Sequence, residues 1–105
     1  MDYLYPRRYP RFRSTDPAVI EVLDRPESVG EFVAGSTRDI GAGGVFVVSE
    51  EGMVPGLRVR LSVNLERLGR AIKTLGSVIR CEPGGFAIEF DEALPEAMHS
   101  QATPG

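Results

Sequence analysis

Hydrophobic and polar residues alternate most regularly between positions 57 and 65. Odd positions from Leu57 to Leu65 are apolar, and the even positions between them are polar or charged. A period of two is typical of a β-strand with one buried face and one solvated face. Arg58 and Arg60 fall on the polar side, where solvated charges are the common case. We therefore predict a strand that lies with its apolar face on a core.

Five further segments are rich in β-branched or aromatic residues and end at clusters of glycine, proline, serine or acidic residues. Such segments are typical of short strands separated by turns. Gly35 and Ser36 interrupt the second of the six strands and indicate a bend or bulge there. The predicted strands cover residues 18–24, 30–40, 45–48, 57–65, 71–81 and 86–90.

The last two predicted strands form a hairpin. Residues 82–85 read Glu-Pro-Gly-Gly, a composition typical of a tight turn. Phe86, Ile88 and Phe90 should then face the core. Six short strands without a long amphipathic helix predict an all-β fold, a six-stranded antiparallel barrel, because closing the sheet removes its exposed edges.

The two ends of the chain differ from this barrel. Three prolines within residues 1–17 disfavour a helix, although Arg7 and Arg11 have helical spacing. We therefore predict an extended or turning Arg-rich loop over residues 1–16 and a barrel over residues 17–93. Residues 94–105 are predicted to form a short helical turn and a disordered tail.

Length and composition fit one domain, with 105 residues of which 42% are hydrophobic. No apolar segment has the length of a signal peptide or a membrane span, and a lone cysteine fits a reducing compartment. We therefore expect a cytoplasmic protein without a transmembrane segment. The formal net charge of -3 argues against DNA or RNA as partner, since nucleic-acid binders usually carry a basic face. A small barrel for single-stranded nucleic acid is thus a distant alternative.

Arginines are concentrated near the start of the chain. Arg7, Arg8, Arg11 and Arg13 lie in one short segment, and a guanidinium can donate paired hydrogen bonds to a phosphate or to a guanine edge. Residues 39–44 read Asp-Ile-Gly-Ala-Gly-Gly. The glycines let backbone amides approach a ligand, and the aspartate can accept from the N–H groups of a guanine. Together the two segments predict a nucleotide-binding site.

No set of residues in the chain predicts catalysis. No nucleophile is paired with a base, and the adjacent carboxylates Glu50 and Glu51 fall in a predicted loop. Cys81 is the only cysteine, which excludes an intramolecular disulfide and a cysteine zinc site. We therefore predict a binding protein rather than an enzyme, with no metal and no cofactor.

The two segments resemble the signature of the PilZ domain family. That signature is Arg-x-x-x-Arg, followed roughly thirty residues later by Asp/Asn-x-Ser-x-x-Gly and a strand. Arg7 and Arg11 match the first half, and Asp39 and Gly44 match the second, while Gly41 stands at the serine position. The resemblance extends over residues 7–92, because residues 43–47 and 83–90 also look like a strand and a hairpin of the family.

The resemblance implies a receptor for the bacterial messenger cyclic di-GMP. Arg7 and Arg11 would contact phosphates and guanine edges, with Arg8 as a supporting cation. Asp39 would accept from a guanine, and Gly44 would permit close backbone approach. In the family, ligand binding closes the Arg loop over the barrel and changes the surface that a downstream protein partner meets. Proline rather than arginine before the first motif residue favours one ligand molecule per domain.

Gly41 departs from the family pattern. A missing serine hydroxyl removes one hydrogen bond to the ligand, worth about 1 kcal/mol, so weakened binding is expected. An alternative function is therefore a PilZ-like protein-interaction module with weak or lost ligand binding, acting in motility or pilus assembly. Retention of Arg7, Arg11 and Asp39 favours the receptor, and Gly41 favours the alternative.

Overall fold

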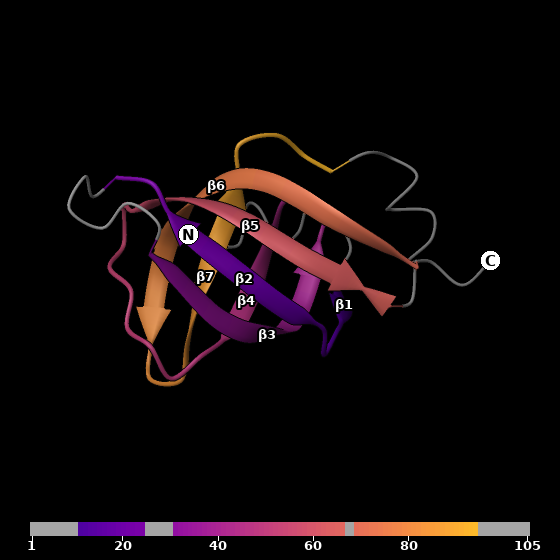
Figure 1. Cartoon of the computed structure of the whole chain (residues 1–105), viewed down its shortest axis with the longest axis horizontal. Helices are drawn as coiled ribbons and strands as arrows, with labels where there is room; N and C mark the ends of the chain where they lie inside the picture. The colour runs from indigo at the N-terminus through magenta and orange to yellow at the C-terminus, as the bar shows by residue number, and fades with distance from the viewer. Residues whose placement is uncertain (1–10, 25–30, 67–68, 95–105) are drawn as a thin grey trace.

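Antiparallel strands account for most of the chain that the computed structural model describes, residues 11–24, 31–66 and 69–94 (Figure 1). For residues 11 and 12 only the backbone is described. The strands are β1 (Arg11–Arg13), β2 (Pro17–Val22), β3 (Phe32–Gly41), β4 (Gly44–Val48), β5 (Arg58–Leu65), β6 (Arg70–Glu82) and β7 (Gly85–Phe90).

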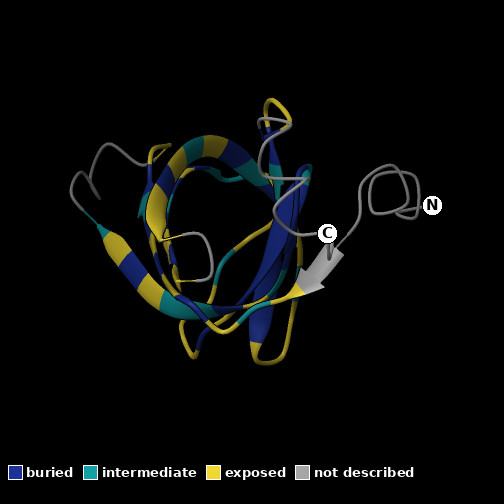
Figure 2. Cartoon of the chain, turned by 90° about the vertical axis from the view of Figure 1, so that its right-hand side faces the viewer, coloured by how far each residue is buried: buried dark blue, intermediate teal, exposed yellow. Residues whose placement is uncertain are grey.

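The ring closes on β3, because this strand pairs along both of its edges. One edge pairs with β2 and the other with β4, and the remaining neighbours follow in the order β2, β5, β6, β7 and β4. The six strands thus form a closed ring, which Figure 2 shows from one end. The short β1 lies beside β3 on the same edge as β2. The prediction of a six-stranded antiparallel barrel is confirmed.

The core follows the alternation seen in the sequence. Along β5, the apolar residues from Val59 to Leu65 are at most 4% exposed, and Leu57 packs against the cluster that they form. Phe86, Ile88 and Phe90 are also buried, as predicted. The polar positions of β5 face outward, where alternate side chains of a strand must point when the others fill the barrel.

One predicted irregularity lies elsewhere. Gly35 and Ser36 keep regular partners on β2, Ala18 and Pro17, so no bulge forms at that pair. The pairing of β3 with β4 instead shifts between Thr37 and Asp39. The bulge expected in this strand therefore exists, but it lies one to three residues further along the chain.

β1 lies within the segment for which we expected an extended or turning loop. Its pairing with β3 means that the last part of that segment belongs to the sheet. Arg7, Arg8 and nearly all of the helical turn predicted from residue 94 lie outside the described residues. Among the residues that are described, no helix is long and apolar enough to span a membrane.

A cluster of polar side chains joins β1 and β2 to β3. The hydroxyl of Ser14 donates to a carboxylate oxygen of Asp16, so the 2.6 Å contact between Ser14 Oγ and Thr37 Oγ1 has Thr37 as its donor. Thr37 Oγ1 also accepts from the backbone N–H of Asp16 at 2.9 Å. The other carboxylate oxygen of Asp16 accepts from the N–H of Glu66 at 3.2 Å. Because Thr37 and Asp16 are buried, this cluster fixes how the chain passes from β1 into β2.

Replacing Thr37 with valine tests this cluster. The change keeps the shape of the side chain but leaves the buried N–H of Asp16 without its acceptor, which should cost about 1–3 kcal/mol of stability. Urea unfolding of the wild-type chain and the variant measures the difference. Thr15→Val is the matched control, since Thr15 is exposed, and it should leave the midpoint nearly unchanged. Equal stability of the two variants would contradict a structural role for the cluster.

Candidate functional site

The pairing of β1 with β3 brings the two motif segments side by side. Arg11 lies opposite Gly41, and Arg13 lies opposite Asp39. Residues directly opposite each other in an antiparallel pair project to the same face, so the exposed side chain of Arg13 shares the outer face of the barrel with Asp39. Position 41 faces the same way as Asp39, because alternate residues of a strand share a face. A cation position and an acceptor position thus meet on one surface.

Asp39 lies between β1 and β4 with a side chain that is 20% exposed. Its Oδ2 accepts a hydrogen bond from Nε of Arg38 at 3.0 Å. Strict alternation would place two successive residues on opposite faces of the strand, and the sequence analysis did not select Arg38. The bulge between Thr37 and Asp39 removes this alternation, so both side chains lie on the same face. The arginine directly before the motif aspartate is visible in the sequence, but nothing there shows that a bulge places the two side chains together.

The turn between β3 and β4 is held by the end of β7 and by the segment that follows it. The N–H of Phe90 donates to the carbonyl of Gly43 at 2.9 Å, and the N–H of Leu94 donates to the carbonyl of Ala42 at 2.8 Å. Ala42 and Leu94 are both buried. The backbone of the glycine-rich turn is therefore tied to the end of the barrel strand and has a fixed position beneath the site.

The start of that segment is itself fastened to the barrel. Both terminal nitrogens of Arg58 donate to the carboxylate of Asp91, at 2.7 Å and 2.5 Å, and one of them also donates to Ser77 at 2.8 Å. The hydrogen bond from Arg58 lowers the pKa of Asp91 below its usual value. The pair is therefore ionised at neutral pH and joins β5 to the end of β7 across β6.

Gly44 serves the packing of β4 against β7. A Cβ at this position would lie 2.5 Å from the carbonyl oxygen of Ile88, closer than any tolerated contact. Only glycine lets the two strands approach in this way. This observation gives the last motif glycine a structural reason that does not depend on a ligand.

A protein-family model decides the identity of the fold. The model described as PilZ domain matches residues 5–102. The chain belongs to the PilZ domain family. PilZ domains are ligand-binding or regulatory modules, which agrees with the sequence analysis. Among curated proteins, no significant match was found.

Solved structures agree with this assignment of the fold. The PilZ domain of YcgR from Escherichia coli with c-di-GMP is 15% identical, with a TM-score of 0.70 over 90% of this chain and 86% of that one. The PilZ domain of CeSA from a cellulose-synthesizing bacterium is 18% identical, with a TM-score of 0.61 over 88% and 89%. The Bacillus subtilis inhibitor of motility MotI is 24% identical, with a TM-score of 0.66 over 91% of this chain. This chain spans only 47% of MotI, about half of that protein.

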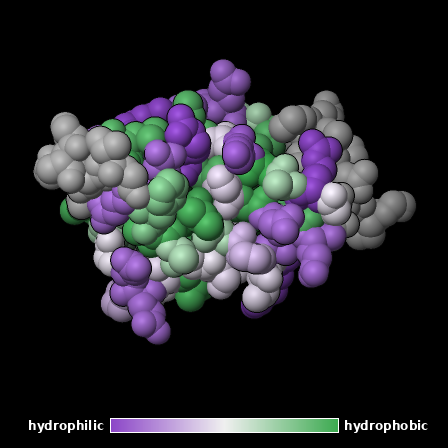
Figure 3. All heavy atoms as spheres, viewed as in Figure 1, coloured by the Kyte–Doolittle hydropathy of each residue, from purple (hydrophilic) through white to green (hydrophobic). Residues whose placement is uncertain are grey.

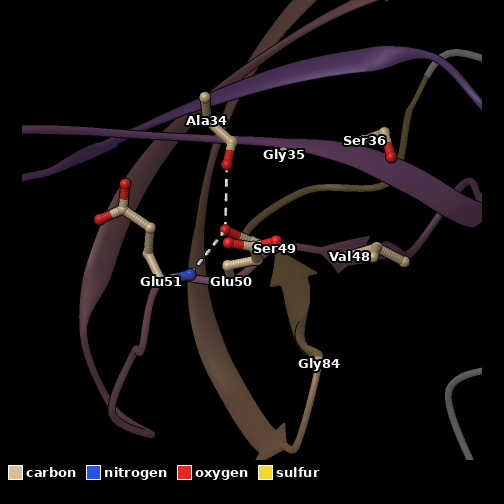
Figure 4. A pocket seen from close by; sticks show the side chains of 8 residues that line it. All are labelled: Ala34, Gly35, Ser36, Val48, Ser49, Glu50, Glu51 and Gly84. Carbon is tan, nitrogen blue, oxygen red and sulfur yellow. Dashed lines mark hydrogen bonds between the residues drawn. The ribbon is translucent and has the colours of Figure 1, made fainter.

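A depression lies at the other end of the β3 and β4 pair (Figure 4). Ser49 Oγ donates to the carbonyl of Ala34 at 3.0 Å and accepts from the N–H of Glu51 at 3.2 Å, which closes the wall of this depression. Glu50 and Glu51 are exposed at its rim. Two carboxylates, with no cation among the described residues that line the depression, repel phosphate and make this a poor place for a nucleotide.

The outer face of β2 and β3 carries apolar side chains (Figure 3). Val19 is 42% exposed and lies opposite Ala34, and Phe32 is 57% exposed and lies opposite Glu21. On the edge of β2 that faces β5, the carboxylate of Glu21 accepts a hydrogen bond from Arg60 of β5 at 2.7 Å. An apolar strip bordered by an ion pair has the composition of a protein contact surface.

Replacing Gly44 with alanine separates packing from ligand contact. The added methyl group would press on the Ile88 carbonyl and should lower the free energy of unfolding by about 1–3 kcal/mol without any ligand. Denaturant unfolding of the ligand-free variant measures this loss. Gly52→Ala is the control, because nothing lies within 4 Å of its Cβ position. A fully stable Gly44→Ala chain would show instead that the glycine serves the ligand alone.

Proposed function

We propose that this PilZ domain is a bacterial receptor that binds cyclic di-GMP. The observation that carries the proposal is the register of β1 on β3, which sets Arg11 opposite Gly41 and Arg13 opposite Asp39. Arginine forks suit the phosphates and the guanine O6/N7 edges of this ligand, and a carboxylate suits its N–H groups. The similarity to the YcgR domain, whose structure contains c-di-GMP, supports the same ligand here.

Each motif residue has a role in this proposal, and Gly44 permits close approach of the backbone to the ligand. Arg7 and Arg11 bind phosphate oxygens and guanine edges, Arg8 adds positive charge, and Asp39 accepts from a guanine. Gly41 leaves the space of the family serine, so the ligand loses one hydrogen bond at that point. One ligand molecule occupies the domain.

The response to the ligand lies in the segment before the barrel. Of residues 1–16, the part before β1 closes over the ligand on the barrel formed by residues 17–93, and residues 94–105 form a helical turn and tail. Closure of this segment changes the surface that a downstream protein in the cytoplasm contacts. The domain acts without catalysis or cofactor. Similarity to MotI, an inhibitor of motility, makes motility the first process to examine.

Calorimetric titration tests the ligand. Wild-type protein should bind cyclic di-GMP with micromolar or tighter affinity, because several charge-assisted hydrogen bonds form together. The stoichiometry should be one ligand molecule per protein chain. The Arg7→Ala/Arg11→Ala protein should show no binding heat, and cyclic di-AMP should bind far more weakly. No heat with the wild-type protein at high ligand concentration would contradict the proposed function.

Restoring the family serine tests the role of position 41. Gly41→Ser should tighten cyclic di-GMP binding by about fivefold, the equivalent of one hydrogen bond of about 1 kcal/mol. Gly52→Ser, at an exposed position away from the motif, is the control and should leave affinity unchanged. If Gly41→Ser binds no better than the wild-type chain, the glycine is not the cause of weakened affinity.

The second candidate function is a protein-interaction module, which the apolar strip with Val19 and Phe32 favours. A partner covering that strip would bind equally well with and without cyclic di-GMP. Absence of ligand binding in the titration, together with a partner lost in Phe32→Ser, would select this alternative.

A further inference from the structure

The bulge in β3 places an additional residue on the outer face of the site. Thr37 lies opposite Val47, and Asp39 lies opposite Phe46, so two steps along β3 match one step along β4. Arg38 is the extra residue. In such a bulge two successive side chains project beside a single partner residue. Arg38 therefore lies with Asp39 on the outer face, although ordinary alternation would separate the two.

Phe46 forms a platform for this arginine. Its neighbours Val45 and Val47 belong to the core cluster, so the Phe46 ring lies on the outer face, yet it is only 3% exposed. The ring extends toward Gly85 on β7, where a Cβ would lie 2.5 Å from Cε1. The guanidinium carbon of Arg38 lies over the ring, 3.9 Å from its centroid. Stacking on an aromatic ring restricts the guanidinium and preorganises its donors.

The guanidinium is held at two points and still has donors for a ligand. Nε of Arg38 is occupied by Asp39, while the two terminal nitrogens make no hydrogen bond with any described residue. The side chain is 49% exposed. A carboxylate has about four lone-pair sites, so accepting from Arg38 does not use the whole capacity of Asp39. The pair thus presents an acceptor directly beside a donor.

An acceptor beside a donor complements the Watson–Crick edge of guanine but not that of adenine. The Watson–Crick edge of guanine has the N1–H and 2-amino donors next to the O6 acceptor. In adenine the N1 acceptor lies next to the 6-amino donor, which is the reverse order. An aspartate beside an arginine can therefore satisfy one guanine with both groups, whereas adenine would face an acceptor with an acceptor and a donor with a donor.

We infer that Arg38, stacked on Phe46 and bound to Asp39, is a specificity-determining residue that donates to O6 of the guanine whose N–H groups Asp39 accepts. The inference rests on the proposed function and deepens it, because it names the residue that distinguishes guanine from adenine. It also gives the Phe46 ring a role in the site, as the support that keeps Arg38 in position.

Competition binding with cyclic di-GMP and cyclic di-AMP tests the inference. Arg38→Ala should raise the dissociation constant for cyclic di-GMP about tenfold and leave that for cyclic di-AMP unchanged. The preference for cyclic di-GMP over cyclic di-AMP should therefore fall about tenfold. A residue that only attracts phosphate would change both ligands equally. Thermal unfolding of the ligand-free variant should show only a small loss of stability, because the half-exposed Arg38 gives up only its stacking on Phe46 and its pair with Asp39.

Arg60→Ala is the matched control. Arg60 is also 49% exposed and paired with a carboxylate, that of Glu21, but it lies on β5. The Arg60→Ala protein should bind both ligands with wild-type affinity, so the ratio of the two dissociation constants should not change. Equal losses for the two ligands in Arg38→Ala, or no loss for cyclic di-GMP, would overturn the inference while the receptor function stands. A wild-type chain that binds neither nucleotide would overturn both.

Discussion

The double pairing of β3 is the constraint on which the rest of the structure depends. A strand paired along one edge would leave the sheet open, and β4 would lose one of its two neighbours. Because β2 takes one edge and β4 the other, the sheet closes, and the strand that closes it is also the strand that carries Asp39. The geometry of the candidate site is therefore inseparable from the closure of the barrel.

The barrel itself could be predicted because its signals are local. Alternation along β5 identifies the buried face one residue at a time, and Pro83 and Gly84 mark a turn without reference to distant residues. The two motif segments were also visible in the sequence, since residue types and spacing alone carry the resemblance. Their meeting was implied by the family and is seen in the register of β1 with β3.

The surroundings of Asp39 could not be predicted, because they depend on contacts between distant residues. β1 is only three residues long, too short to give a periodic pattern, and its position depends on Asp16, Thr37 and Glu66. The bulge at Arg38 is visible only as a mismatch in pairing between two strands. No local pattern indicated that a Cβ at Gly44 would press on Ile88 of β7.

The end of β3 and the turn that follows it are contacted by two segments that lie far apart in the sequence. Gly41 is the pairing partner of Arg11 in β1, and the carbonyl of Ala42 accepts from the N–H of Leu94, after β7. β1 and the segment after β7 therefore meet beside the motif. A displacement of either segment would act on the same few backbone atoms.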